Sequence, residues 1–196
     1  MRQTTIDRQT RETEIHVQLN LDGQGQHDLA TGVPFLNHML SHVAVHGSLD
    51  LVVSARGDTE VDDHHTVEDV GICLGQAMRA ALGDKRGITR YAHQLLPMDE
   101  ALVLVAMDLS GRGLLVYDVP FPQPTIGLFH VELVYEFLQA LATNAGLCLH
   151  VKLLYGSNAH HIAEAVFKGV GRCLGEAVRI DPDRANAVPS TKGMLS

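Results

Sequence analysis

Apolar residues recur along the chain with two spacings, which predict a mixture of strands and helices. Ile15, Val17 and Leu19 fall on every second position, which is typical of a strand with one buried face. Helical spacing begins at Pro34, because proline fits the first turn of a helix. We predict helices at 34–46, 64–82, 130–145 and 160–179, and strands at 13–21, 26–31, 49–55, 89–96, 101–109, 113–119 and 147–155. Asp22–Gly25 is expected to form a hairpin turn, and Gly83 to end the second helix.

The same order of elements occurs twice, which indicates an internal duplication. The matched residues are Ile15, Val17 and Leu19 with Val103, Val105 and Met107; Leu49, Leu51 and Val53 with Leu147, Leu149 and Val151; and Cys73-Leu74-Gly75 with Cys173-Leu174-Gly175. We expect an α+β fold of antiparallel sheets, each covered on one face by helices, built from two half-domains related by a pseudo-two-fold axis. A single domain would span 1–196, with repeats at about 8–87 and 88–184 and a tail at 185–196.

Composition narrows the class of protein. The chain has 196 residues, is 45% hydrophobic and has a formal net charge of −8. The sequence has no apolar run long enough for a membrane span. The acidic balance, without a basic run, argues against nucleic acid as a partner. Residues 1–8 lack the apolar core of a signal peptide, and three cysteines without C-x-x-C spacing favour a reduced, cytoplasmic protein.

Two segments share the pattern His-His-x-x-Glu at the start of a predicted helix. They are His64-His65-Thr66-Val67-Glu68 and His160-His161-Ile162-Ala163-Glu164. Imidazole and carboxylate without thiolate are the donors of a catalytic transition-metal centre. Positions i and i+4 share a helix face, whereas i+1 is turned away. Packed about a two-fold axis, the segments would hold two ions, one with His160, Glu164 and His65, the other with His64, Glu68 and His161.

The preceding helices offer a further ligand for each ion. The repeat places His38 opposite Glu136, and we include both as candidate ligands. These donors suit manganese, iron or zinc. His42 is expected on the surface or in the core, and Asp63 is a candidate N-cap of its helix. The remaining histidines without a partner pattern are expected to be structural: His16, His27, His93, His130 and His150.

Basic and hydroxyl residues near turns and in the tail suggest an anion site. Hydroxyls, backbone N–H groups and cations together bind phosphate. The candidates are Arg90, Arg112, Lys168, Ser190, Thr191 and Lys192. No Walker-type loop is present, so a nucleotide is not implied.

Several motifs, in order, resemble one known family. They are Phe35-Leu36-Asn37-His38-Met39-Leu40, His46-Gly47, Asp63-His64-His65-Thr66-Val67-Glu68-Asp69, Asp108-Leu109-Ser110-Gly111-Arg112, Asn158-Ala159-His160-His161-Ile162-Ala163-Glu164-Ala165 and Ser190-Thr191-Lys192-Gly193. From about Arg8 to Leu195 the chain resembles imidazoleglycerol-phosphate dehydratase. The resemblance implies a hydro-lyase of histidine biosynthesis that converts imidazole glycerol phosphate to imidazole acetol phosphate and water. It also implies two manganese ions per active site and a homo-oligomer of twenty-four subunits, with active sites formed between subunits.

The resemblance also assigns roles to single residues. It implies that Glu12 transfers protons and that His46 contacts the substrate, while the basic and hydroxyl residues named above hold its phosphate. One position departs from some members: the plant enzymes carry a metal-binding histidine where this chain has Glu136. Carboxylate for imidazole is a tolerable exchange at manganese.

Two other classes of function fit parts of the pattern. A binuclear metallohydrolase, such as a phosphatase, would use the same ligand types to activate water, and it would release inorganic phosphate. A metal-storage or sensing protein would need neither the phosphate-binding cations nor Glu12.

Overall fold

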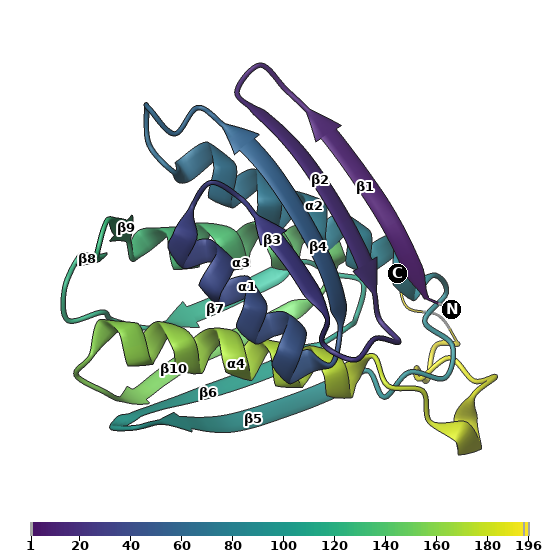
Figure 1. Cartoon of the computed structure of the whole chain (residues 1–196). Helices are drawn as coiled ribbons and strands as arrows, with labels where there is room; N and C mark the ends of the chain where they lie inside the picture. Colours follow the sequence, from purple (N-terminus) through teal and green to yellow (C-terminus); the bar gives the residue numbers. More distant parts are fainter. Residues whose placement is uncertain (1, 194, 196) are drawn as a thin grey trace.

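Two four-stranded sheets enclose a layer of four helices in the computed structural model, which describes residues 2–193 and 195 (Figure 1). The helices are α1 (Pro34–Gly47), α2 (His64–Leu82), α3 (Glu132–Ala145) and α4 (Ala159–Ala177). The strands are β1 (Gln3–Gln9), β2 (Thr13–Asn20), β3 (His27–Ala30), β4 (Asp50–Gly57), β5 (Tyr91–Met98), β6 (Ala101–Asp108), β7 (Leu114–Asp118) and β10 (Cys148–Tyr155), with a small hairpin of β8 (Thr125–Ile126) and β9 (Phe129–His130). A 3-10 turn, Pro182–Arg184, lies in the tail. No helix in the described part of the chain is long and apolar enough to span a bilayer.

The strand register confirms the internal duplication. The sheets have the orders β1-β2-β4-β3 and β5-β6-β10-β7, which are the same order in the two repeats. Val17 pairs with Val53 in the first sheet, and the matched residues Val105 and Val151 pair in the second. The α+β prediction is therefore confirmed, but each sheet also contains one parallel pair, β3 with β4 and β7 with β10. The expectation of antiparallel sheets is confirmed for the other pairs of these two sheets and is wrong for these two.

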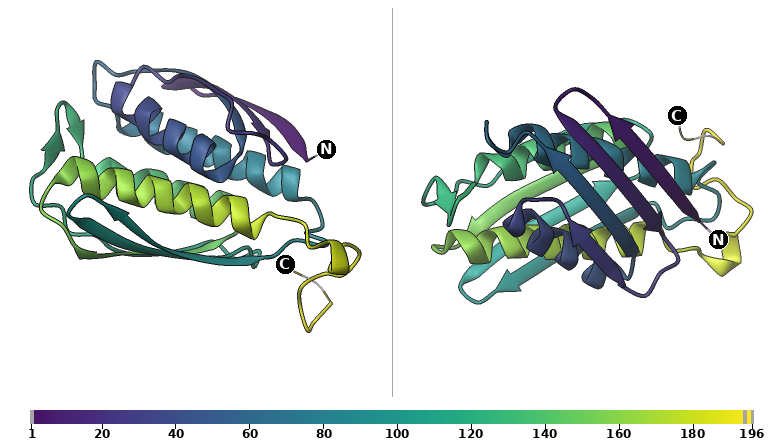
Figure 2. Two further views of the ribbon diagram at one scale, coloured as in Figure 1. Left: turned by 60° about the horizontal axis from the view of Figure 1, so that its bottom comes forward. Right: turned by 45° about the horizontal axis from the view of Figure 1, so that its top comes forward.

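The two repeats meet through their helices. Helices α1 and α2 cover the first sheet, α3 and α4 cover the second, and across the interface α1 packs on α4 and α2 on α3 (Figure 2). Glycines allow close approach at both crossings. A β-carbon at Gly175 would lie 2.4 Å from the carbonyl oxygen of Gly47, and one at Gly75 would lie 2.8 Å from that of Leu141. Larger residues there would force the helices apart, because packed interiors have little free volume.

Two local predictions at the N-terminal end are wrong. The sequence pattern predicts no strand over residues 3–9, because all of them except Ile6 are polar and none is fully buried, as an edge strand allows. Asp22–Gly25 does not form a hairpin turn, since β2 and β3 do not pair but both flank β4. The Asp50 side chain holds this loop instead, accepting hydrogen bonds from the backbone N–H groups of Gln24 and Gln26 at 2.8 and 3.0 Å.

Helices α2 and α4 begin with the two His-His-x-x-Glu segments. The prediction of a helix from His64 to Leu82, ended at Gly83, is confirmed. Asp63 occupies the N-cap position, but its side chain accepts no helix N–H; Asp62 accepts the one from His64 at 2.8 Å. The alignment of the two cysteines is wrong. Cys73 lies nine residues after His64 and Cys173 thirteen after His160 in unbroken helices, so they differ by one helical turn.

Candidate active site

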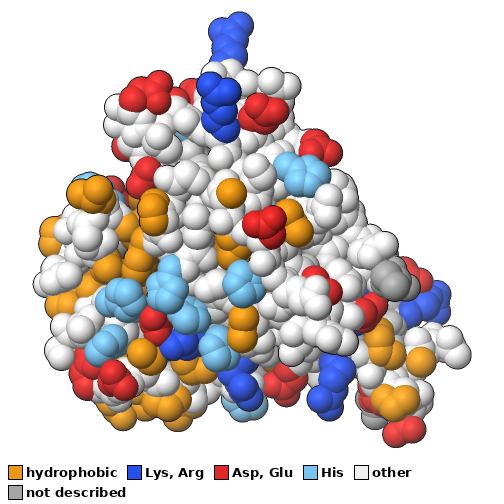
Figure 3. Space-filling model, in the orientation of Figure 1, with side chains coloured by type: hydrophobic (Ala, Val, Ile, Leu, Met, Phe, Trp, Pro, Cys, Tyr) orange, Lys and Arg blue, Asp and Glu red, His pale blue; other side chains and the backbone are white. Residues whose placement is uncertain are grey.

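Three predicted metal ligands meet where α1 crosses the start of α4. His38 comes from α1, and His160 and Glu164 share one face of α4. Their donor atoms lie within 4.8 Å of one another. Glu164 Oε1 is 2.9 Å from His38 Nε2 and 3.1 Å from His160 Nε2. Figure 3 shows histidine side chains gathered on this face of the molecule. We call His38, His160 and Glu164 the α1–α4 set.

His42 belongs to the same cluster, although the sequence pattern placed it on the surface or in the core. It lies one turn after His38 on α1, and the ring centroids of the two are 4.5 Å apart. Its Nε2 is 3.4 Å from Glu164 Oε1 and is buried without a hydrogen-bond partner among the described residues. Burial lowers the pKa of His42 to about 4, against the opposing effect of Glu164. The ring is therefore neutral at pH 7.

Glu164 is the buried charge of this set. Burial alone would raise its pKa, but hydrogen bonds from Lys168, His38 and His160 outweigh burial and hold the pKa well below its usual range. The Lys168 ammonium donates to Glu164 Oε2 at 2.6 Å. The sequence predicts that Lys168 binds phosphate, but within one chain its ammonium lies beside the predicted metal ligands.

The α1–α4 set has the donors that a divalent transition metal requires. Two imidazoles and one ionised carboxylate leave coordination positions open, as a catalytic centre needs. The Nε2 atom of His42 beside them is buried and has no hydrogen-bond partner among the described residues. Buried polar atoms normally have a partner, so this cluster has room for a further ligand. The residues present therefore fit a metal ion.

The ligands that the repeat matches to the α1–α4 set are farther apart. We call His64, Glu68 and Glu136 the α2–α3 set, because α2 packs against α3. His64 Nε2 and Glu68 Oε2 are 3.7 Å apart, and their side chains are 40% and 45% exposed. Glu136 is half-buried on α3. Among the described residues, these three do not form a group of donors close enough to share an ion without adjustment.

The second histidine of each segment points to a carboxylate of its own repeat. His65 Nδ1 lies 3.0 Å from Asp58 and 3.9 Å from Glu12, and His161 Nδ1 lies 2.7 Å from Glu100. The hydrogen bond to the carboxylate raises the pKa of both histidines. Among the residues that the structure describes, neither histidine joins the ligands of the opposite repeat.

Most phosphate candidates gather at the other end of the molecule. They line a hollow of about 930 Å³ between the start of β5 and the tail, together with Thr89, Tyr91, Ser110 and residues 187–189. Arg90, Arg112, Ser190, Thr191 and Lys192 are the predicted residues in it. These five lie together in the hollow, whereas Lys168 does not line it.

Arg90 is held in this hollow by several contacts. Asp108 accepts two hydrogen bonds from its guanidinium, at 2.7 and 3.1 Å, and thereby raises the pKa of Arg90. The carbonyl of Pro189 accepts a third at 2.7 Å, which ties the tail to β5. Arg90 has a φ of 75°, unusual for a residue with a side chain, and such strain is concentrated at functional sites.

The length of α4 separates the two clusters. His160 lies in its first turn, whereas the carbonyl of Ala177, in its last, accepts a hydrogen bond from the Arg90 backbone at 2.8 Å. Seventeen residues of helix span roughly 25 Å. Within one chain, metal ligands and phosphate candidates therefore lie at opposite ends of the fold.

His46 lies two turns along α1 from His38, in a smaller hollow lined also by Gln94, Arg172 and Glu176. Burial lowers its pKa, and the charges of Lys168 and Arg172 lower it further. Its ring centroid is 5.8 Å from that of His42, so the three α1 histidines form a row along the helix.

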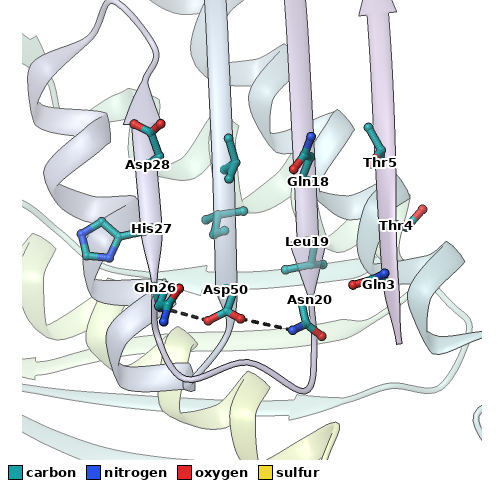
Figure 4. A pocket seen from close by; sticks show the side chains of 12 residues that line it. Gln3, Thr4, Thr5, Gln18, Leu19, Asn20, Gln26, His27, Asp28 and Asp50 are labelled. Carbon is teal, nitrogen blue, oxygen red and sulfur yellow. Dashed lines mark hydrogen bonds between the residues drawn. The ribbon is translucent and has the colours of Figure 1, made fainter. Parts of the chain in front are cut away.

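Another hollow, of about 590 Å³, lies on the outer face of the first sheet (Figure 4). Amide, hydroxyl and carboxylate side chains of β1 to β4 line it. Asp50 accepts hydrogen bonds from the Asn20 side chain and from the backbone N–H groups of Gln24 and Gln26, and the figure shows those from Asn20 and Gln26. This hollow contains none of the predicted site residues.

Sequence reasoning missed several residues of the site. His42 could have been found from its i+4 spacing to His38. Asp108 stands in a motif that was recognised, but only the structure shows that it orients Arg90. Asp58 and Glu100 lie in turns and carry no local signal, since their partners are distant in sequence.

The comparisons with known proteins agree over almost the whole chain. The family model for imidazoleglycerol-phosphate dehydratase matches residues 31–174. A protein of that name from Desulforudis audaxviator is 60% identical over 196 residues, covering 100% of this chain and 99% of its own. One from Cereibacter sphaeroides is 57% identical over 195 residues, covering 100% of both chains.

Solved structures show the same fold. The imidazoleglycerol-phosphate dehydratase of Staphylococcus aureus has a TM-score of 0.84 and 37% identity, covering 91% of this chain and 99% of its own. The Pyrococcus furiosus structure has the same TM-score and identity, covering 97% and 100%. The chain belongs to the imidazoleglycerol-phosphate dehydratase family, hydro-lyases that catalyse the dehydration step of histidine biosynthesis.

Proposed function

We propose that this chain is a manganese enzyme that converts imidazole glycerol phosphate to imidazole acetol phosphate and water at sites shared between copies of the chain. The proposal rests above all on the α1–α4 set, three donors within 4.8 Å of one another around a buried ionised carboxylate. Family membership supplies the reaction and a phosphorylated imidazole as substrate. We further propose two manganese ions per active site and a cytoplasmic location.

The proposed ligands fall into two sets related by the repeat. His38, His160 and Glu164 would hold one ion, and His64, Glu68 and Glu136 the other. His65 and His161 would complete the sets. Within one chain each of them points to a carboxylate of its own repeat, so a second copy is the natural source of these donors. When bound, the ions would act as Lewis acids on the substrate's imidazole ring and fix its position.

The separation of the two clusters supports a shared site. A three-carbon chain joins ring to phosphate in the substrate, and with carbon–carbon bonds of about 1.5 Å it cannot bridge roughly 25 Å. The phosphate cluster of one copy must therefore meet the metal ligands of another. Symmetric homo-oligomers build such contacts repeatedly. We propose the twenty-four-subunit assembly of the family for this chain.

The chain's own residues supply binding and proton transfer. Arg90, Arg112, Ser190, Thr191 and Lys192 would hold the phosphate and thereby fix the ring. The Glu12 carboxylate, 56% exposed and beside His65, would move a proton between the substrate carbon and the leaving hydroxyl. His46 would contact the substrate from the end of the α1 row, and Lys168 would hold Glu164 ionised.

A complementation experiment tests the shared site. Glu164→Gln and Arg112→Ala subunits, each inactive alone, are co-expressed with different tags and purified as mixed oligomers. If each site takes metal ligands from one copy and phosphate ligands from another, random mixing restores about a quarter of the sites. Dehydration of imidazole glycerol phosphate is measured with and without manganese, alongside free phosphate.

The possible outcomes separate the alternatives. Recovered, manganese-dependent formation of the acetol phosphate supports the proposal. Mixed oligomers as inactive as either parent would contradict a shared site. Release of inorganic phosphate by the unmodified protein would instead indicate a metallohydrolase.

A further inference from the structure

The repeat places two glutamates at equivalent turns, and their surroundings differ. Glu12 directly precedes β2 and Glu100 directly precedes β6, the matching strand. Each lies beside the second histidine of its repeat, His65 or His161. Glu100 Oε2 lies 2.7 Å from His161 Nδ1, whereas Glu12 Oε2 is 3.9 Å from His65 Nδ1, beyond hydrogen-bond distance.

The backbone also fixes Glu100. Its Oε1 accepts hydrogen bonds from the N–H groups of Asn158 and Ser157, at 2.7 and 3.2 Å. These residues directly precede α4, so the carboxylate joins the β5–β6 turn to the start of the ligand helix. Both oxygens of Glu100 are thus engaged, and no hydrogen bond of the Glu12 carboxylate is present among the described residues.

A single position explains why the two glutamates differ. Asp58 directly follows β4, and its two carboxylate oxygens lie 3.1 and 3.0 Å from His65 Nδ1. The matching residue after β10 is Gly156. A β-carbon there would lie 3.0 Å from Ala101 Cβ and 3.1 Å from Ile162 Cγ1, so a side chain at this position would be crowded. In the second repeat Glu100 takes the place that Asp58 holds in the first.

We infer that Asp58 and Glu100 are the positioning residues of His65 and His161, and that this division of roles leaves Glu12 as the free carboxylate of the repeat-related pair. The inference rests on the proposed function, in which both histidines bind metal. A carboxylate that accepts the Nδ1 proton fixes the tautomer and leaves Nε2 as the nitrogen that could bind a metal ion. Glu100 cannot both hold His161 in this way and exchange protons with substrate.

Parallel variants test these roles by separating metal affinity from turnover. Glu100→Ala and Asp58→Ala are expected to weaken manganese binding about 10- to 100-fold, the usual effect of losing a partner of a ligand histidine. Their turnover recovers when manganese is saturating. Glu12→Gln is expected to bind manganese like the unmodified protein and to stay inactive at any manganese concentration. Glu14→Gln, an exposed glutamate two residues from Glu12, is the matched control for both measurements.

Two further measurements separate positioning from a purely structural role. Glu100→Gln keeps a carbonyl oxygen for the Nδ1 proton, so it should recover part of the affinity that Glu100→Ala loses. In a His161→Ala background, Glu100→Ala should weaken manganese binding little further, because its partner is already gone. Binding is followed by manganese electron paramagnetic resonance, and folding by melting temperature in the metal-free state.

The outcomes distinguish failure of this inference from failure of the proposed function. If the unmodified protein shows no manganese-dependent dehydration, the proposed function fails. If that activity is present but Glu100→Ala binds manganese normally and cannot be rescued, Glu100 shares the role given to Glu12 and the inference is overturned. Full additivity of Glu100→Ala with His161→Ala would overturn it as well.

Discussion

The two His-His-x-x-Glu segments have the same ligand spacing but very different surroundings. In α4, Glu164 is buried and is contacted by His38, His42, His160 and Lys168. In α2, Glu68 is 45% exposed, and the one ion pair described for it is with His64 at 3.7 Å. The spacing places two donors on one face of each helix, and the neighbouring helix then decides whether a compact set forms.

The neighbouring helices differ at a few matched positions. His38 and His42 on α1 correspond to Glu136 and Ala140 on α3, and Lys168 on α4 corresponds to Ile72 on α2. The α2–α3 set therefore lacks the imidazoles of both His38 and His42 and also the cation that neutralises the glutamate. The two repeats have the same arrangement of helices and strands. The residues at these matched positions make the α1–α4 set compact within one chain and leave the donors of the α2–α3 set farther apart.

Replacing the two glutamates is the strongest test of this difference. Glu164→Gln and Glu68→Gln should each lower turnover about a thousandfold or more, because a metal site contributes several kcal/mol to transition-state stabilisation. Their effects on the metal-free fold should differ. Glu164→Gln leaves the half-buried Lys168 without its carboxylate and should cost about 1–3 kcal/mol, whereas Glu68, whose side chain is 45% exposed, should contribute less than about 0.5 kcal/mol.

Denaturant unfolding in chelator and manganese content after reconstitution give the two readouts. Equal loss of unfolding free energy in both variants would show that burial of Glu164 against Lys168 adds nothing beyond what the more exposed Glu68 contributes. An active Glu68→Gln protein with full manganese content would remove Glu68 from the ligand set.

Lowering the pH should affect the metal-free and metal-loaded protein in opposite directions. The pKa values of His65 and His161 are raised by Asp58 and Glu100. In the metal-free chain these ion pairs are therefore stabilising below the ordinary histidine pKa of about 6.5, and their contribution is lost as pH rises through the raised pKa values. Metal binding needs neutral imidazole, so manganese affinity should fall with pH, and activity should decline below about pH 6.

Manganese titrations and turnover between pH 5 and 8 check this expectation, and added manganese should move the decline to lower pH. Retained metal and full activity at pH 5 would contradict it. In the metal-free chain, the contribution of His42 changes with pH in the opposite sense to those of His65 and His161. Its pKa is lowered to about 4 by burial, so its contribution to stability is complete above the ordinary histidine pKa and is lost as pH falls toward 4.

The fold was predictable where apolar spacing is strong, and it was missed where tertiary contacts decide. Helix α2 matches its predicted bounds because helical spacing and Gly83 both mark its ends. The duplication followed from matched apolar residues such as Val53 and Val151, which the strand register confirms. Strand β1 could not be found this way, since an edge strand needs no apolar face.

The candidate site was predictable as a set of residue types and less so as an arrangement. The spacing of His160 and Glu164 predicted one shared face, which the structure shows. No spacing rule predicts that Asp58 or Glu100 reaches a histidine, because those contacts depend on how turns approach helix starts. The metal-binding role of His65 and His161 stays a prediction for the same reason, since within one chain both histidines contact carboxylates.

Glu136→His is expected to have the smallest effect on turnover among the variants that test the difference between the two sets. Glu136→His would place an imidazole at the position that matches His38 and would make the α2–α3 set resemble the α1–α4 set more closely. Both donors suit manganese, so turnover should change only a few-fold, whereas Glu136→Ala should lower manganese content. Metal analysis and turnover of the two variants, made side by side, check this. Full manganese content in Glu136→Ala would show that α3 contributes no ligand. The α2–α3 set would then differ from the α1–α4 set in its number of ligands as well as in its surroundings.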